Sequence, residues 1–104
     1  MATILLIGVD PLFWEELERL LVTHHVITAD NVDMPELVIA DIGRVEPEEV
    51  AEAYPETPLL GYSSHLDAAG ERIAYEAGFD RVIARTALET EIEELVSLLT
   101  APVE

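Results

Sequence analysis

The chain has 104 residues, of which 22 are acidic and 5 are basic, so its formal net charge is −17. Half of the residues are hydrophobic, which excludes a disordered chain, and the length suits a single domain over residues 1–104 without an output domain. A field this negative repels nucleic acids and anionic lipid surfaces, so we expect neither as a partner. The absence of cysteine excludes disulfides and thiol chemistry.

The acidity itself has a plain explanation in solvated helix faces, coding bias or a salty cytoplasm. All the basic residues are arginines, and none of them lies in a basic stripe. The longest apolar run, Ile4–Val9, is far shorter than the roughly 20 residues of a membrane span, and it lacks the flanks of a signal peptide. We therefore expect a cytoplasmic protein.

Strands and helices alternate from the start of the chain. Thr3–Val9 is a continuous apolar run, which is typical of a strand covered on both faces. Asp10 is a good N-cap and Pro11 suits the first helical position, so a helix is predicted to run to Val22. The apolar residues at helical spacing predict its buried face: Phe13, Leu17, Leu20 and Leu21.

Four further strands and three further helices are predicted along the chain. The strands are His25–Ala29, Leu37–Asp41, Pro58–Tyr62 and Arg81–Ala84. The helices are Pro47–Ala53, Leu66–Ala77 with Gly78 as its C-cap, and Ala87–Leu99. This alternation predicts an α/β fold with a doubly wound parallel sheet.

Polar residues stand where several predicted strands end, and ligands of an open α/β sheet bind at those ends. We expect Asp41, Ser63 and Arg85 to lie close together there. A carboxylate beside a hydroxyl and a cation could bind an anion or carry a phosphoryl group. A plainer interpretation stays open, in which Asp41 caps the following turn, Ser63 caps the next helix and Arg85 neutralises Asp41.

Other kinds of chemistry find less support in the sequence. Neither glycine-rich nucleotide motif is present, and adjacent His24 and His25 would point to opposite faces of a strand, so they cannot share a metal. Ser63 and His65 lack the G-x-S-x-G motif of a hydrolase. We expect no catalytic residue and no enzyme activity.

Four segments, taken in this order, resemble response-regulator receiver domains of the CheY-like type. Residues 4–13, ILLIGVDPLF, are similar to the opening ILIVDDHPLF of NarL-type receivers. Residues 35–41, PELVIAD, and 58–64, PLLGYSS, are similar to PDLVLLD and PVIMLTA. Residues 74–85, AYEAGFDRVIAR, are similar to ALEAGADDYLTK. The resemblance covers nearly the whole chain and implies a flavodoxin-like fold with a five-stranded parallel sheet in the order 2-1-3-4-5.

The resemblance also implies roles for individual positions. Asp41 matches the phosphoacceptor, Ser63 the hydroxyl residue that follows the phosphoryl group on activation, and Arg85 the lysine of the family. The acid pair that binds Mg²⁺ falls on Gly8 and Val9, and neither has an oxygen-bearing side chain. We therefore expect no bound Mg²⁺ and no other cofactor.

Loss of the metal decides the expected function, because phosphoryl transfer needs a cation to neutralise developing charge. We expect a stand-alone pseudo-receiver of two-component or phosphorelay signalling that acts through protein–protein contacts. Two alternatives stay open. One is a response regulator phosphorylated on Asp41 by a histidine kinase or small phosphodonor. The other is a sensor of a small anion or ligand at Gly8, Asp41, Ser63 and Arg85.

The link between the second and third strands is too short for a helix. Only residues 30–36 remain, whereas a helical crossover takes about a dozen residues or more. An extended crossover is predicted in place of the usual second helix, with Val32 and Met34 covering part of the sheet. These two residues, with Tyr75 and Val82, are the predicted partner surface. The partner would be a second copy, or a histidine-kinase-type or other regulatory protein.

Overall fold

The computed structural model describes residues 2–28 and 34–100. Five parallel strands form one sheet in the order β2-β1-β3-β4-β5, as predicted. The strands are β1 (Thr3–Ile7), β2 (His25–Ile27), β3 (Leu37–Asp41), β4 (Leu59–Ser63) and β5 (Arg81–Ala84). The helices are α1 (Pro11–Leu20), α2 (Pro47–Ala53), α3 (Ala68–Ala77) and α4 (Arg85–Thr100).

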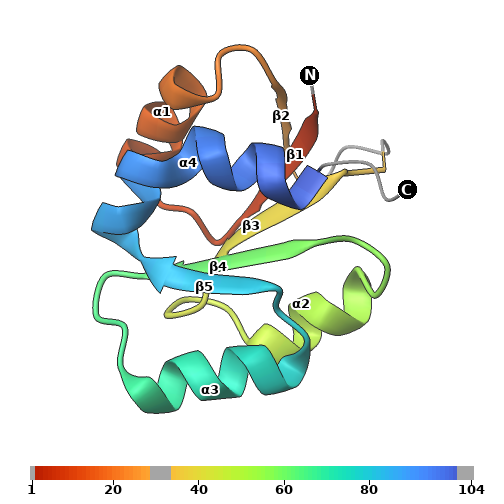
Figure 1. Cartoon of the computed structure of the whole chain (residues 1–104), viewed down its shortest axis with the longest axis vertical. Coiled ribbons are helices and arrows are strands. Elements are labelled where there is room, and N and C mark those ends of the chain that lie inside the picture. The colour runs from red at the N-terminus through yellow and green to blue at the C-terminus, as the bar shows by residue number, and fades with distance from the viewer. Residues whose placement is uncertain (1, 29–33, 101–104) are drawn as a thin grey trace.

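The helices cover both faces of the sheet (Figure 1), with α1 and α4 on one side and α2 and α3 on the other. The central strand β3 is buried along its whole length, which explains its unbroken apolar sequence. The sheet separates two hydrophobic clusters: Phe13, Leu17 and Tyr62 belong to the cluster under α1 and α4, whereas Val50 and Phe79 belong to the other. No helix in the described ranges is long and apolar enough to cross a membrane.

The N-cap predicted at Asp10 and the C-cap predicted at Gly78 are present. The Asp10 carboxylate accepts a hydrogen bond from the Phe13 N–H at 3.0 Å, and Pro11 opens α1. Gly78 ends α3 with φ +124°, a left-handed conformation that favours glycine. Residue-level capping signals therefore predicted these helix ends well.

Some element bounds differ from the sequence prediction. β1 ends at Ile7 instead of Val9, because Gly8 has φ +70° and leaves the extended conformation of the strand. The third helix begins at Ala68 instead of Leu66, because the Asp67 side chain provides its N-cap. The last helix begins at Arg85, directly after β5, and not at Ala87. The first helix ends at Leu20 and not at Val22, and Ala29 lies outside the described residues.

The described part of the link between β2 and β3 contains no helix, in line with the prediction. The other residues of the predicted crossover over 30–36, including Val32, lie outside the described residues. Glu36 is tied to β1, since its N–H donates to the Thr3 carbonyl at 2.7 Å and its carboxylate accepts from the Thr3 N–H at 3.2 Å. Met34 is 81 % exposed, so the prediction that it covers the sheet is wrong.

Gly61 in β4 provides a test of the packing on the face of the sheet that α2 and α3 cover. A Cβ atom there would lie 2.8 Å from Ile42 Cγ2 and 2.9 Å from Phe79 Cδ2. We expect Gly61→Ala to lower the free energy of unfolding by about 1–3 kcal/mol, measured by urea denaturation. Gly70→Ala is the control, because a Cβ there meets only the exposed Asp67 carboxylate. An unchanged midpoint for Gly61→Ala would contradict the expectation.

Candidate functional site

The carboxyl ends of β3 and β4 border an open cavity of about 290 Å³. Its lining residues are Asp10, Asp41, Gly43, Arg44, Ser63, Ser64 and His65. Two of the three residues that we expected to meet, Asp41 and Ser63, therefore lie at the same cavity. Arg85, Gly8 and Val9 do not line it.

Asp41 is buried, with only 8 % of its surface exposed, and it organises the turn that follows β3. Its carboxylate accepts a hydrogen bond from the Gly43 N–H at 2.9 Å. Its carbonyl accepts from the N–H groups of Arg44 at 3.0 Å and Val45 at 3.1 Å. The expectation that Asp41 caps the following turn is confirmed.

Ser63 does not cap the next helix, contrary to one interpretation of the sequence. Its hydroxyl oxygen accepts a hydrogen bond from the His65 N–H at 3.2 Å and so supports the loop that leaves β4. The helix cap is supplied four residues further on, by the Asp67 carboxylate at 2.7 Å from the Gly70 nitrogen. The hydroxyl group of Ser63 remains at the cavity wall.

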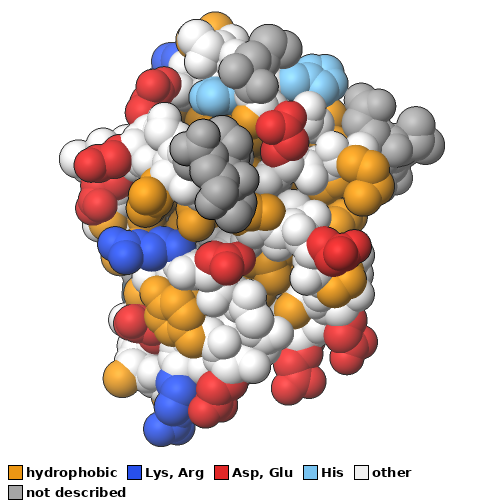
Figure 2. Space-filling view, turned by 45° about the vertical axis from the view of Figure 1, so that its right-hand side comes forward, with side chains coloured by type: hydrophobic (Ala, Val, Ile, Leu, Met, Phe, Trp, Pro, Cys, Tyr) orange, Lys and Arg blue, Asp and Glu red, His pale blue; other side chains and the backbone are white. Residues whose placement is uncertain are grey.

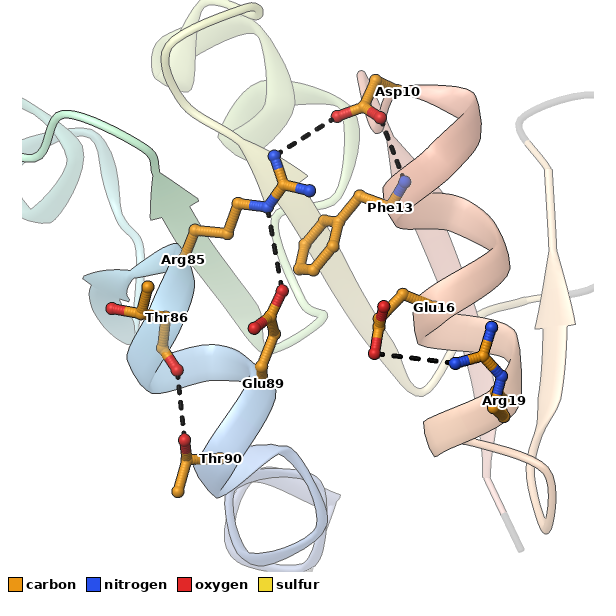
Figure 3. Close-up of polar contacts among 8 residues, drawn as sticks. All are labelled: Asp10, Phe13, Glu16, Arg19, Arg85, Thr86, Glu89 and Thr90. Atoms are coloured by element: carbon orange, nitrogen blue, oxygen red, sulfur yellow. Dashed lines mark hydrogen bonds and ion pairs between the residues drawn. The ribbon is translucent and has the colours of Figure 1, made fainter.

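Arg85 pairs with Asp10 and not with Asp41, which corrects the predicted ion pair. Its Nη1 lies 3.7 Å from Asp10 Oδ2, and its Nε lies 4.0 Å from Glu89 Oε1 (Figure 3). The guanidinium carbon lies 4.2 Å from the centre of the Phe13 ring. Since α4 begins at Arg85 and packs beside α1, the side chain extends over α1. Each partly exposed ion pair is weak alone, but the three contacts together fix the guanidinium.

Asp10 is the site residue whose full role the sequence did not reveal. The capping pattern identified its place at the start of α1 but gave no sign of its contact with Arg85. The hydrogen bond from the Phe13 N–H holds the pKa of the Asp10 carboxyl below its ordinary value. Desolvation opposes this shift, and the positive charge of Arg85 lowers the pKa further. Arg44 was also missed as a residue of the cavity, because no motif in the sequence marks it.

The two positions that the resemblance assigns to the acid pair contribute no ligand oxygen. A Cβ atom on Gly8 would lie 2.6 Å from Val45 Cγ1, and the φ of +70° at Gly8 disfavours any side chain there. Val9 packs against the hydrophobic cluster under α1 and α4. Within residues 2–28 and 34–100, no group of three or more carboxylate or imidazole side chains could hold a metal ion.

Tyr62 lies beside Asp41 in the sheet, and its ring packs edge-on against Phe13 with the centroids 5.1 Å apart. The side chain is 1 % exposed, and its hydroxyl has no hydrogen-bond partner among the described residues. Burial raises the pKa of the Tyr62 hydroxyl far above its ordinary value, and the negative charges of Asp41 and Asp10 raise it further. The phenol therefore stays protonated.

The predicted partner surface is only partly available. Tyr75 is 40 % exposed, and its hydroxyl oxygen accepts a hydrogen bond from the Val82 N–H at 3.0 Å. Val82 is 5 % exposed, so its side chain offers little surface to a partner, contrary to the prediction. Val82 is buried because it faces the hydrophobic cluster under α2 and α3.

The fold is that of response-regulator receiver domains. A response regulator from Thermotoga maritima has a TM-score of 0.81 at 17 % identity, and the alignment covers 98 % of this chain and 99 % of that one. The non-phosphorylated HemR receiver domain from Leptospira biflexa has a TM-score of 0.79 at 18 % identity, covering 100 % and 98 %. The Mn²⁺-bound form of the response regulator Rcp1 has a TM-score of 0.78 at 13 % identity, covering 100 % and 98 %. No protein-family model and no curated protein matches the sequence.

The chain therefore has the CheY-like receiver fold that its sequence predicts. The order of the strands and the near-complete coverage of the receiver structures support this assignment independently of sequence identity.

Asp10 offers a test that separates helix capping from charge. Asp10→Asn keeps a capping oxygen and removes the charge, whereas Asp10→Ala removes both, so we expect the alanine variant to melt at the lower temperature. The pKa of Asp10 in the folded state is lowered from its ordinary value of 3.8. The ionised carboxylate therefore stabilises the fold above pH 3.8, and this stabilisation is lost as the pH falls through the folded-state pKa.

The difference in Tm between the wild type and Asp10→Asn should therefore be largest near neutral pH and should decrease below about pH 4. Melting curves across that range, followed by circular dichroism, measure it. Asp67→Asn, at the N-cap of α3, is the matched control for capping. A difference that stays constant with pH would contradict a stabilising Asp10 charge.

Tyr62→Phe tests the cost of the buried hydroxyl. The substitution keeps the ring contact with Phe13 and removes a polar group that has no described partner. We expect the free energy of unfolding to rise by about 1 kcal/mol in urea denaturation. Tyr54→Phe, at a partly exposed tyrosine, is the control. A loss of stability in Tyr62→Phe would contradict the expectation, because it would mean that the hydroxyl is hydrogen-bonded in solution.

Proposed function

We propose that this chain is a receiver-like module of two-component signalling that acts through protein–protein contacts, without Mg²⁺-dependent phosphorylation and without enzyme activity. The fold shared with response regulators supports the signalling part of the proposal. The observation that carries the second part is the backbone at Gly8, where the resemblance locates the first metal-binding acid.

An aspartate at position 8 would be both strained and crowded. The left-handed φ of +70° costs energy for any residue with a Cβ atom, and Val45 Cγ1 occupies the space 2.6 Å from that atom. The Val45 backbone lies in the turn after β3, where its N–H donates to the Asp41 carbonyl, so an aspartate at position 8 would require the Val45 side chain or this turn to shift. The same turn that positions the phosphoacceptor-equivalent residue thus fills the space of a metal ligand.

Two carboxylates line the cavity: Asp41, which accepts the Gly43 N–H, and Asp10, which is a poor substitute for the missing acid pair. One oxygen of Asp10 accepts the Phe13 N–H, and the other faces the Arg85 guanidinium at 3.7 Å. Mg²⁺ needs carboxylate oxygens in near-octahedral geometry, whereas one of these oxygens accepts a backbone N–H and the other faces a guanidinium. On this donor set, the residues present do not fit Mg²⁺.

A phosphoacceptor function at Asp41 is the second candidate, because Asp41 and Ser63 line one cavity. Among proteins of this fold, one from Burkholderia pseudomallei is described with a phosphorylated aspartate and a calcium ion. The third candidate, an anion sensor, would use Arg44 at the cavity, because Arg85 is held by Asp10 and Glu89.

The partner in this proposal is a histidine-kinase-type or other regulatory protein, and a homodimer is a further form of the same idea. A cytoplasmic location and the exclusion of nucleic acid belong to the proposal and stay predictions. The net charge of −17 supports the exclusion of polyanions.

A phosphoryl mimic tests the proposal directly. We expect Mg²⁺ with beryllofluoride to leave both Tm and Trp14 fluorescence unchanged, because the metal lacks its acid pair. Wild type and Asp41→Asn should respond identically. Mg²⁺-dependent stabilisation that disappears in Asp41→Asn would instead establish the phosphoacceptor function. Stabilisation by phosphate without metal would establish an anion sensor. Loss of that stabilisation in Arg44→Ala or in Arg85→Ala would identify the cation.

A further inference from the structure

We propose that a groove beside the start of α1 binds a basic segment of a partner protein through one of that segment's large apolar side chains. The groove has a volume of about 450 Å³. Its lining residues are Val9, Pro11, Trp14, Glu15 and Thr28. This inference rests on the proposed function in that the signal passes to a protein, and it adds the surface and the chemistry of that partner.

Three of the residues that line the groove are anchored in the fold. Val9 and Trp14 are partly buried and pack against the hydrophobic cluster under α1 and α4. Pro11 is fixed at the first position of α1 by the Asp10 cap. A preformed groove costs little ordering on binding, and tryptophan is a residue type enriched among the side chains that dominate binding energy.

The surroundings of the groove are apolar and acidic. Glu15 at its wall forms no ion pair with a described residue, and Glu18 is exposed one turn further along α1. The one arginine of this helix, Arg19, already lies 3.8 Å from Glu16. Leu12, also in α1, is 78 % exposed. Such a surface suits a segment in which cationic side chains flank an aliphatic or aromatic one.

Charge selects this occupant over the other possible ones. A second copy of the chain would bring another −17, and nucleic acids or anionic lipids would be repelled in the same way. On the face shown in Figure 2, acidic side chains are spread over the surface, whereas arginines are isolated. A basic partner is attracted by the whole molecule and is then held at the groove by apolar contact.

The test uses a short synthetic peptide of alternating arginine and leucine, with binding followed by the fluorescence of Trp14, the single tryptophan of the chain. We expect binding with a blue shift of the Trp14 emission. Thr28→Arg should weaken the affinity about tenfold, because it adds a cation opposite Glu15 and fills the groove. Thr90→Arg changes the net charge equally at an exposed position of α4, and it should bind almost like the wild type.

Peptides with changed composition and a milder variant complete the test. Replacing the leucines by serine, or the arginines by glutamate, should abolish the blue shift. Glu15→Gln should weaken binding more than Glu93→Gln, an exposed control on α4. Rising salt should weaken binding mainly by slowing association.

Two results would overturn the inference. Equal losses in Thr28→Arg and Thr90→Arg would mean that the peptide follows net charge only. Concentration-dependent dimerisation that Thr28→Arg abolishes would assign the groove to a second copy. Either result leaves the proposed function standing, since that depends on the beryllofluoride response. A Mg²⁺-dependent response lost in Asp41→Asn would overturn the proposed function and leave the peptide result unchanged.

Discussion

The turn after β3, built on Asp41, is the constraint on which the rest of the site depends. One buried carboxylate and one carbonyl of the same residue accept three backbone N–H groups, from Gly43, Arg44 and Val45. This bonding places the Val45 backbone beside β1, and Val45 Cγ1 lies 2.6 Å from where a Cβ atom on Gly8 would lie. Val45 therefore fills the space beside Gly8, the position that the resemblance assigns to the first metal-binding acid.

The sequence was most informative where local chemistry decides the structure. Apolar runs predicted the strands, and the pair Asp10 and Pro11 predicted the start of α1, because a side-chain oxygen and a fixed φ act within a few residues. Likewise, Gly78 marked the end of α3 through its left-handed conformation. Such signals need no knowledge of the tertiary structure.

The sequence failed where an outcome depends on the relative placement of distant elements. It correctly predicted that Asp41 and Ser63 lie close together, because the carboxyl ends of neighbouring parallel strands share one edge of the sheet. It paired Arg85 with Asp41 instead of Asp10, because the direction of the Arg85 side chain depends on α4 beginning at residue 85 and packing beside α1. The crowding at Gly8 was equally invisible, since it depends on a valine thirty-seven residues away in sequence (45 − 8).

The crowding at Gly8 and the ion pair of Arg85 with Asp10 both affect the carboxyl ends of the strands. The resemblance assigns Arg85 to the position of the family's lysine, the cation at the strand ends. Here the cation is engaged by Asp10, Glu89 and the Phe13 ring. Asp10 also caps α1. If the guanidinium moved away, the carboxylate that caps this helix would lose its ion-pair partner. One carboxylate thus joins the start of α1 to the first residue of α4, a link that neither helix could make from its own sequence.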